Sequence, residues 1–297
     1  MSVHIPDDSL RLIPHSLIVK LQAVYNSLKT AEKKAADLLI QKPQFIAQAT
    51  ISEAAAEACC SDATLVRLAK RLGFEGYPEL KQCLRLGNDM ASGSDDVKLY
   101  GNISKSDSFD EIVKKVFQSS IQALTDTLGI LDMENYKRAV DAVAGAEKIV
   151  LCGVGDAANV ARSGYQKFIR AGFNVQVSAD LDVQLIAASH LCHGDVVIAI
   201  SHSGRSKSVV ELVKYARTTG AVIISITNYP VSPLAKNSDI VLMTAAFAEH
   251  VKGEVMSKRV TELCILESIY VNTVMMQEDK LAPRLKQSNA ALEINKL

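Results

Sequence analysis

A short loop dense in hydroxyl groups is the first feature of this 297-residue sequence that could do chemistry. The apolar run Val196–Ile200 leads directly into residues 201–208, which read SHSGRSKS, and a helical pattern begins at Val209. Where a strand ends in such a loop and a helix opens, backbone N–H groups and the helix dipole favour an anion, and serines add donors. The loop is therefore predicted to bind a group such as phosphate. The alternative is a plain helix N-cap with surplus serines.

A second set of residues has the spacing of a helix-turn-helix. Residues Ile51–Arg71 read ISEAAAEACCSDATLVRLAKR: a short Ala-rich helix, a tight turn at Cys59 and Cys60, and a second helix capped by Ser61. On a helical wheel one arc of the second helix is apolar, and Gly73 provides a natural stop. The apolar arc holds Leu65, Leu68, Ala69 and Leu72. The opposite arc holds Ala63, Thr64, Arg67, Lys70 and Arg71.

The polar arc of the second helix has the residue types that read a DNA major groove. Arg67 could contact base edges while Lys70 and Arg71 lie near phosphates. The candidate DNA-binding residues are Ser61, Ala63, Thr64, Arg67, Lys70 and Arg71. The alternative is the solvated face of a three-helix bundle. Charge permits the DNA role without deciding it, because the whole chain has a formal net charge of zero, whereas Thr64–Arg85 holds five Lys and Arg against two Asp and Glu.

The elements around this motif are all helical. From Ser16 to Arg85 the apolar residues recur at helical spacing, which predicts an all-α domain. Thr30 and Ser52 are predicted to cap two of its helices. The polar, Gly- and Ser-rich stretch Asn88–Ser108 is predicted to be a linker.

Beyond this linker the pattern changes to alternating strands and helices. Two helices, over about residues 109–131 and 133–144, precede five short apolar runs, and a long apolar helix over about 254–276 follows them. Runs this apolar are typical of strands buried on both faces of a parallel sheet. The C-terminal half is therefore predicted to be a doubly wound α/β domain. The predicted strands are Ile149–Cys152, Val175–Val177, Val196–Ile200, Val222–Ile226 and Ile240–Met243.

The helix-turn-helix resembles a known family. The run Ser61-x-x-Thr64-x-x-Arg67-x-x-Lys70-Arg71-Leu72-Gly73-Phe74-x-Gly76-Tyr77-x-x-Leu80-Lys81 resembles the N-terminal DNA-binding domain of RpiR-type regulators, over about residues 17–86. The resemblance implies a regulator that binds a double-stranded DNA operator. The family usually has Gly at the turn where this chain has Cys59, so we expect a strained or different turn there.

The hydroxyl loop resembles the phosphosugar loop of the sugar isomerase (SIS) domain, over about residues 136–278. The shared order is a strand, Ser-x-Ser-Gly-x-Ser and a helix. The resemblance implies that Ser201, Ser203 and Ser206 hold the phosphate of a small phosphorylated sugar, and that His202 and Gly204 shape the loop. RpiR-type regulators join these two domains in the same order.

An earlier glycine turn matches the same domain. Gly153-Val-Gly155 follows the first predicted strand, and its pairing with the serine loop about 50 residues later makes it informative. Two positions depart from the relatives: Ala157 replaces a frequent Ser, and Asp182 stands where many have His. Asp156 is expected beside the anion, where it could weaken binding or contact a sugar hydroxyl.

Composition excludes several other classes of protein. The N-terminal residues show no basic region followed by an apolar one, and the longest apolar run, residues 240–248, is far shorter than the ~20 residues of a spanning helix, so a cytoplasmic location is expected. The six cysteines include no C-x-x-C pair. Neither a metal site, a disulfide framework nor a cofactor is therefore expected, and most of the cysteines are predicted to be buried.

The predicted organisation is a helix-turn-helix domain at 17–87, a linker with connecting helices at 88–135 and an SIS domain at 136–278. Two functions fit it. The first is a homodimeric or homotetrameric regulator whose operator affinity responds to a sugar phosphate. The second is a sugar-phosphate isomerase or lyase using the same pocket, with His250 or Glu254 as general base. An isomerase has no need of residues 17–86, so the regulator is favoured and no catalytic residue is assigned.

Overall fold

The computed structural model describes residues 17, 20, 21, 24, 25, 27–91, 103, 104, 106–246 and 256–295; the side chains of residues 86–91 are not described. The chain divides into two compact units. The boundary lies between Val116 and Phe117, inside the helix α7 (Phe109–Ile130). This point falls within the segment expected to connect the two domains.

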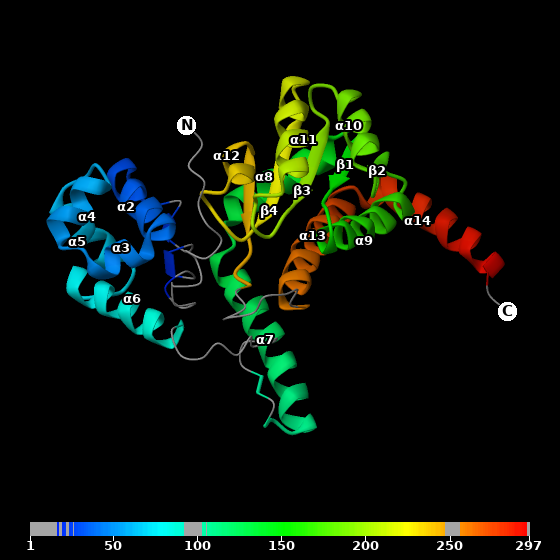
Figure 1. Ribbon diagram of the computed structural model, residues 1–297. Helices are drawn as coiled ribbons and strands as arrows, with labels where there is room; N and C mark the ends of the chain where they lie inside the picture. The colour runs from blue at the N-terminus through cyan, green and yellow to red at the C-terminus, as the bar shows by residue number, and fades with distance from the viewer. Residues whose placement is uncertain are drawn as a thin grey trace. The chain divides into compact units, whose positions relative to one another are not determined.

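The first unit is helical throughout its described part (Figure 1). Its core is formed by large apolar side chains from successive helices, among them Leu39, Ile46, Leu68 and Leu80, which are fully buried. Pro43 separates the helix that ends at Gln41 from the next one, because it has no N–H to continue the former and its fixed φ suits the first position of the latter. The helices are α2 (Thr30–Gln41), α3 (Pro43–Gln48), α4 (Ile51–Glu57), α5 (Asp62–Arg71) and α6 (Tyr77–Ala91).

Ser61 is the N-cap residue of α5, as predicted, whereas the caps predicted for the two earlier helices are wrong by one or two residues. The helix α4 is capped by Thr50 instead of Ser52, because the Thr50 N–H donates to Glu53 and the Glu53 N–H donates back to the Thr50 hydroxyl. The helix α2 includes Thr30 and has Lys29 as its N-cap residue, whose N–H donates to Glu32. In each case a Glu three residues after the cap fixes where the helix begins.

The helix-turn-helix has the predicted form, with α4, a turn at Cys59 and Cys60, and α5. Cys59 has a φ of +49° and is the one residue other than glycine with positive φ in the described part of the chain. The strained turn expected from the missing glycine is therefore present. The predicted apolar arc of α5 is buried, and Gly73 follows the helix with a φ of +81°.

The second unit is a parallel five-stranded sheet with order β2-β1-β3-β4-β5. The strands are β1 (Ile149–Cys152), β2 (Val175–Val177), β3 (Val196–Ile200), β4 (Val222–Thr227) and β5 (Ile240–Met243). All five lie where the apolar runs predicted them, and β4 is one residue longer. The helices are the second part of α7, α8 (Met133–Gly145), α9 (Asp156–Arg170), α10 (Leu181–Ser189), α11 (Lys207–Thr218), α12 (Pro233–Lys236), α13 (Met256–Met276) and α14 (Glu278–Leu292), with a short 3-10 turn η2 (Glu293–Asn295).

Helices cover both faces of this sheet (Figure 1). Along β3, Val196, Ile198 and Ile200 pack in the layer that contains α8, α9 and α13, whereas Val197 and Ala199 pack against α10 and α11. Alternate side chains of one strand thus enter two apolar layers, which explains why every β3 residue is apolar and buried. The doubly wound α/β prediction is confirmed.

Two predictions at other places differ from the structure, and one helix was not predicted. The helix α6 continues to Ala91, past the predicted start of the linker at Asn88, and residues 92–102 and 105 lie outside the described part. The helix α14, which contains Pro283, was not predicted. The expectation of mostly buried cysteines is wrong, because only Cys152 is buried. Within the described ranges, no helix combines the length and hydropathy needed to cross a bilayer.

Candidate functional site

The exposed face of α5 carries most of the residues predicted to contact DNA. Thr64 is the exception: its side chain is buried, so its assignment to the exposed arc is wrong. At 100° per residue Thr64 lies only about 40° from Leu68, at the border of the apolar arc. The residues of the set that are exposed are Ser61, Ala63, Arg67, Lys70 and Arg71.

Thr64 bonds to its own helix instead of facing solvent. Its hydroxyl oxygen lies 2.9 Å from that of Ser61 and accepts a hydrogen bond of 3.1 Å from Nη2 of Arg67. Thr64 therefore helps to fix the direction of Arg67.

A buried carboxylate beneath this face was missed by sequence analysis. The Glu32 side chain, on α2, is 4% exposed, and its Oε1 lies 3.8 Å from Nε of Arg67 and 3.8 Å from Nε of Arg71. A hollow of about 430 Å³ lies here, lined by Lys29, Glu32, Arg67, Lys70 and Arg71. The signal in the sequence was a Glu three residues after a helix start, but its contacts with α5 join residues 35 or more positions apart.

In the second unit, the predicted glycine turn and serine loop lie at one edge of the sheet. β1 and β3 are hydrogen-bonded neighbours, with Cys152 paired to Ala199, and both strands end there. The turn Gly153–Gly155 and the loop that begins at Ser201 are thus adjacent at the carboxyl edge, where open α/β sheets bind ligands.

The serine loop has a fixed conformation. Ser201 is buried and its hydroxyl lies 3.2 Å from that of Ser206, and the hydroxyl of Ser203 accepts the N–H of Arg205 at 3.3 Å. Gly204 has a φ of +62°, and a Cβ placed there would lie 2.2 Å from Oγ of Ser232. A side chain at Gly204 would therefore displace the loop.

The glycine turn is equally constrained. A Cβ on Gly153 would lie 2.8 Å from the backbone of Ala157, and Gly155, with a φ of +59°, is the N-cap residue of α9. The backbone N–H groups of the first turn of α9 thus point to the edge that also holds the serines.

The first turns of α13 add charged residues to this edge that sequence analysis did not identify. Arg259 lies 4.0 Å from the carboxylate of Asp156 and donates a hydrogen bond to Glu262. Burial, together with the positive charges of Lys258 and Arg259, holds the pKa of His202 well below its usual range, so His202 is neutral. The doublet Lys258-Arg259 at the start of a helix was the available signal. Asp156, whose role was open, pairs with Arg259.

Glu262 is fully buried beside this cation. Burial raises the pKa of its carboxyl to about 7, although the charge and hydrogen bond of Arg259 act in the opposite direction. Three buried polar atoms at this edge have no hydrogen-bond partner among the described residues: Nδ1 of His202, Nε of Arg259 and Oε1 of Glu262. Buried polar groups usually have partners, so these three atoms are exceptions to that rule.

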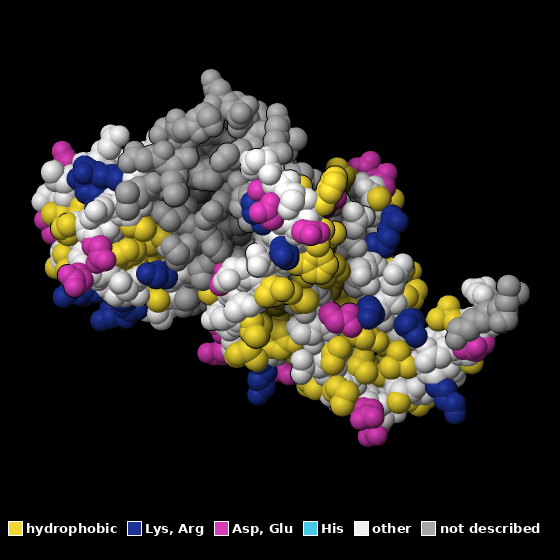
Figure 2. Space-filling view, turned by 90° about the horizontal axis from the view of Figure 1, so that it is seen from below, with side chains coloured by type: hydrophobic (Ala, Val, Ile, Leu, Met, Phe, Trp, Pro, Cys, Tyr) yellow, Lys and Arg dark blue, Asp and Glu magenta, His cyan; other side chains and the backbone are white. Residues whose placement is uncertain are grey.

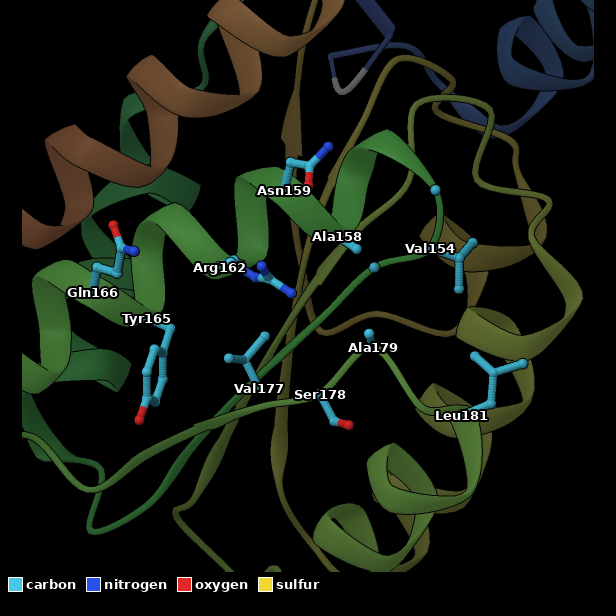
Figure 3. A pocket seen from close by; sticks show the side chains of 12 residues that line it. Val154, Ala158, Asn159, Arg162, Tyr165, Gln166, Val177, Ser178, Ala179 and Leu181 are labelled. Carbon is cyan, nitrogen blue, oxygen red and sulfur yellow. The ribbon is translucent and has the colours of Figure 1, made fainter.

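A cavity of about 690 Å³ opens on the β2 side of the glycine turn (Figure 3). It is lined by Gly153 and Gly155 but by none of the predicted residues of the serine loop. Arg162 extends from α9 across this cavity, and Ser178 and Ala179 border it after β2 (Figure 3). The predicted ligand residues therefore divide between the cavity and the serine loop beside it.

Other predicted or alternative site residues lie elsewhere. Asp182 is exposed in the first turn of α10, and Ala157 is buried in α9. His250 and Glu254, the bases considered for an isomerase, lie outside the described residues. Throughout the described part of the chain, no cluster of three or more His, Cys, Asp and Glu side chains is placed to hold a metal ion.

Both halves of the chain match known domain families. Residues 15–92 match the helix-turn-helix domain of the rpiR family, and residues 143–271 match the SIS domain. A structural relative is the NanR protein of Vibrio vulnificus, solved in complex with ManNAc-6P, at a TM-score of 0.60 and 24% identity over 95% of this chain and 99% of that one. This likeness supports the fold.

Two curated sequence relatives are similar over nearly their whole length. An uncharacterised HTH-type transcriptional regulator of Haemophilus influenzae is 30% identical over 94% of this chain and 97% of its own. The HTH-type transcriptional regulator HexR of Escherichia coli is 28% identical over 94% of both chains. With the two domains in the same order and the fold described above, the chain belongs to the RpiR family of helix-turn-helix transcriptional regulators.

Proposed function

We propose that this regulator binds an operator through α5 and that a phosphorylated sugar, bound at the carboxyl edge of the SIS sheet, changes its affinity for that operator. The observation that carries the ligand proposal is the convergence of the serine loop, the glycine turn and two cations of α13 on one edge. Hydroxyl donors, helix N-terminal N–H groups and basic side chains are the groups that hold phosphate in proteins.

On the DNA side, the exposed candidate residues of α5 and its N-cap residue take different roles. Arg67 reads base edges, and Lys70 binds backbone phosphate. Ser61 and Ala63, at the start of the helix, allow its close approach to the groove. Arg71 donates to the backbone oxygen of Ser27 at 2.9 Å, so it contacts phosphate from a fixed position.

On the ligand side, the phosphate lies against Ser201, Ser203 and Ser206, and the N-terminus of α9 faces it. Gly153 and Gly155 let the backbone approach the ligand closely, while Gly204 and neutral His202 keep the loop in shape. The sugar extends from the phosphate into the neighbouring cavity of about 690 Å³, a size typical of small-molecule sites. NanR, the structural relative, binds a ligand of this chemical class.

The active species is at least a dimer. One recognition helix reads too few base pairs for useful specificity, and two-fold symmetry pairs two half-sites. Hydrophobic side chains gather on the second unit (Figure 2), and on α13 and α9 they include the exposed Val271, Met275 and Ile169. Apolar surface of this kind is suited to burial between subunits. Sedimentation that shows only monomer at micromolar concentration, with and without ligand, contradicts this part of the proposal.

The test of the sensor role is the triple variant Ser201→Ala, Ser203→Ala, Ser206→Ala. Each charge-assisted hydrogen bond to phosphate contributes about 1.5–3 kcal/mol, whereas ligands typically shift the affinity for a second partner by about 1–3 kcal/mol. The variant should therefore lose the response of operator binding to sugar phosphates and the thermal shift they cause. A matched control is Ser208→Ala, in the same sequence run but already within α11.

The outcomes separate the two halves of the proposal. Normal ligand-free operator binding with loss of both ligand responses supports the sensor role. An unchanged ligand response in the triple variant places the anion elsewhere and overturns the assignment of the loop. Loss of ligand-free operator binding as well would mean that the substitutions damage the DNA-binding domain.

A further inference from the structure

The two carboxylate oxygens of Glu32 have separate partners. Oε2 accepts the N–H of Lys29 at 2.9 Å and so caps α2. Oε1 faces the recognition helix and lies 3.8 Å from Nε of both Arg67 and Arg71. One side chain thus joins the start of α2 to the two arginines of α5.

Capping alone does not explain a charged residue at this position. A Gln at the third residue of a helix completes the same capping box as a Glu. A buried carboxylate, in contrast, must recover a large desolvation cost from its partners. Glu32 is buried, so its charge is accounted for by the two guanidinium groups it faces.

These contacts hold the two arginines in different ways. Arg71 is bound on two sides, by Glu32 and by the backbone and hydroxyl oxygens of Ser27 at 2.9 and 3.2 Å. Arg67 is held at Nε by Glu32 and at Nη2 by Thr64, yet its side chain remains 61% exposed. Its guanidinium is thus oriented from one side and accessible to DNA from the other.

We propose, on the basis of the DNA-binding role assigned to α5, that Glu32 is a positioning residue for operator recognition. It fixes the direction of Arg67, and holds Arg71 beside it, before DNA arrives. An arginine oriented in advance loses less side-chain freedom when it forms a bidentate contact with a base, and it is also less able to adapt to a wrong base. Glu32 therefore increases the discrimination between operator and other DNA.

The charge of Glu32 does not prevent DNA from approaching. The hollow around it is lined by four cationic side chains and this one carboxylate, which leaves three positive charges in excess. Glu32 reduces that excess by one charge. It therefore weakens non-specific binding, which depends on charge, while it increases the discrimination between operator and other DNA.

The experiment compares Glu32→Gln with the parent protein on two DNA duplexes. One duplex is enriched from a random pool by the parent, and the other is its scrambled sequence at the same length. Fluorescence anisotropy gives the discrimination ratio, which is the dissociation constant for scrambled DNA divided by that for the enriched duplex. The fraction of active protein cancels in this ratio. The matched control is Glu53→Gln, since Glu53 is also the third-position Glu of a capping box but, among the described residues, bonds to Thr50 and forms no ion pair with an arginine.

Glu32→Gln should lower the ratio about three- to tenfold, in the range of measured couplings between contacting residues. Affinity for scrambled DNA should stay equal or increase, and Glu53→Gln should leave the ratio unchanged. In an Arg67→Ala background the same Glu32 substitution should have little further effect on the ratio. That non-additivity separates positioning of Arg67 from a general loss of stability, which thermal melts report independently.

The results distinguish an error in the positioning role of Glu32 from an error in the DNA-reading role of Arg67. If Arg67→Ala lowers the ratio while Glu32→Gln does not, the positioning role is wrong and the proposed reading by α5 stands. If Arg67→Ala itself leaves the ratio unchanged, the proposed role of Arg67 in reading DNA fails first. Equal losses from Glu32→Gln in the parent and in the Arg67→Ala background also refute the positioning role.

Discussion

The strained turn of the helix-turn-helix gives a prediction that can be tested without knowing the operator. Cys59 occupies the left-handed region with a φ of +49°, where its Cβ is crowded and a glycine is not. The turn is otherwise held by main-chain hydrogen bonds, from Cys59 N–H to Ala56 at 3.1 Å and from Cys60 N–H to Ala55 at 2.9 Å. Cys59→Gly keeps both bonds and removes the strain.

The expected gain follows from two opposing effects. A residue with a Cβ in the left-handed region costs about 1–2 kcal/mol. Glycine costs about 0.5–1 kcal/mol in additional backbone entropy on folding. The difference predicts that Cys59→Gly raises the free energy of unfolding of this unit by about 0.5–1 kcal/mol.

Native-state hydrogen exchange of the full-length protein measures this gain locally. Peptides that cover α4 and α5 should exchange about two- to fivefold more slowly in Cys59→Gly, while peptides from the β-sheet remain unchanged. Cys59→Ala is the control, because it removes the thiol but keeps a Cβ, and its exchange should equal that of the parent. Faster exchange in Cys59→Gly, or equal slowing in both variants, would refute the argument from backbone strain.

Three further predictions concern the two candidate sites. Arg67→Ala should weaken operator binding by about 1–3 kcal/mol, whereas Lys70→Ala should weaken binding to every sequence and reduce the slope of log K against log salt by about 1, as salt titrations would report. Since burial raises the pKa of Glu262 from 4.5 to about 7, the protein should lose up to about 3 kcal/mol of stability as pH rises from 5 to 8. Denaturant unfolding at both pH values should show this loss in the parent but not in Glu262→Gln. Gly204→Ala should cost about 1–3 kcal/mol, because its φ is positive and its Cβ would meet Ser232, and should abolish the ligand-induced thermal shift.

The strands and the recognition helix could be predicted because their determinants are local. A short run such as VVIAI is typical of a strand buried between two helical layers, and β3 consists of those five residues. The arc of α5 centred on Leu65 and Leu68 is buried as the wheel predicts. The helical wheel does not predict burial reliably at the edge of that arc. There the exact position of the neighbouring helices decides whether Thr64 is buried.

The charged partners of the sites could not be predicted because they depend on pairs far apart in the chain. Arg259 meets Asp156 across 103 positions of sequence, and only the parallel sheet order brings the two helices together. The role of Glu32 likewise requires the packing of α2 on α5. A single sequence indicates that such residues are charged but not which charge they will face.

The buried carboxylates among the described residues fall into two groups, according to whether main-chain N–H groups or arginines are their partners. Three are buried: Glu32, Asp195 and Glu262. Asp195 accepts backbone N–H groups of Lys148 and Cys192 at 2.9 and 2.8 Å, so main-chain donors alone account for its burial. Glu32 and Glu262 instead face arginines at the two candidate sites. Replacing such ion pairs by apolar residues is often neutral or stabilising, so stability does not explain why they are present. Their positions beside Arg67 and Arg259 point to the orientation of cations for the proposed anionic partners, DNA at one site and phosphate at the other.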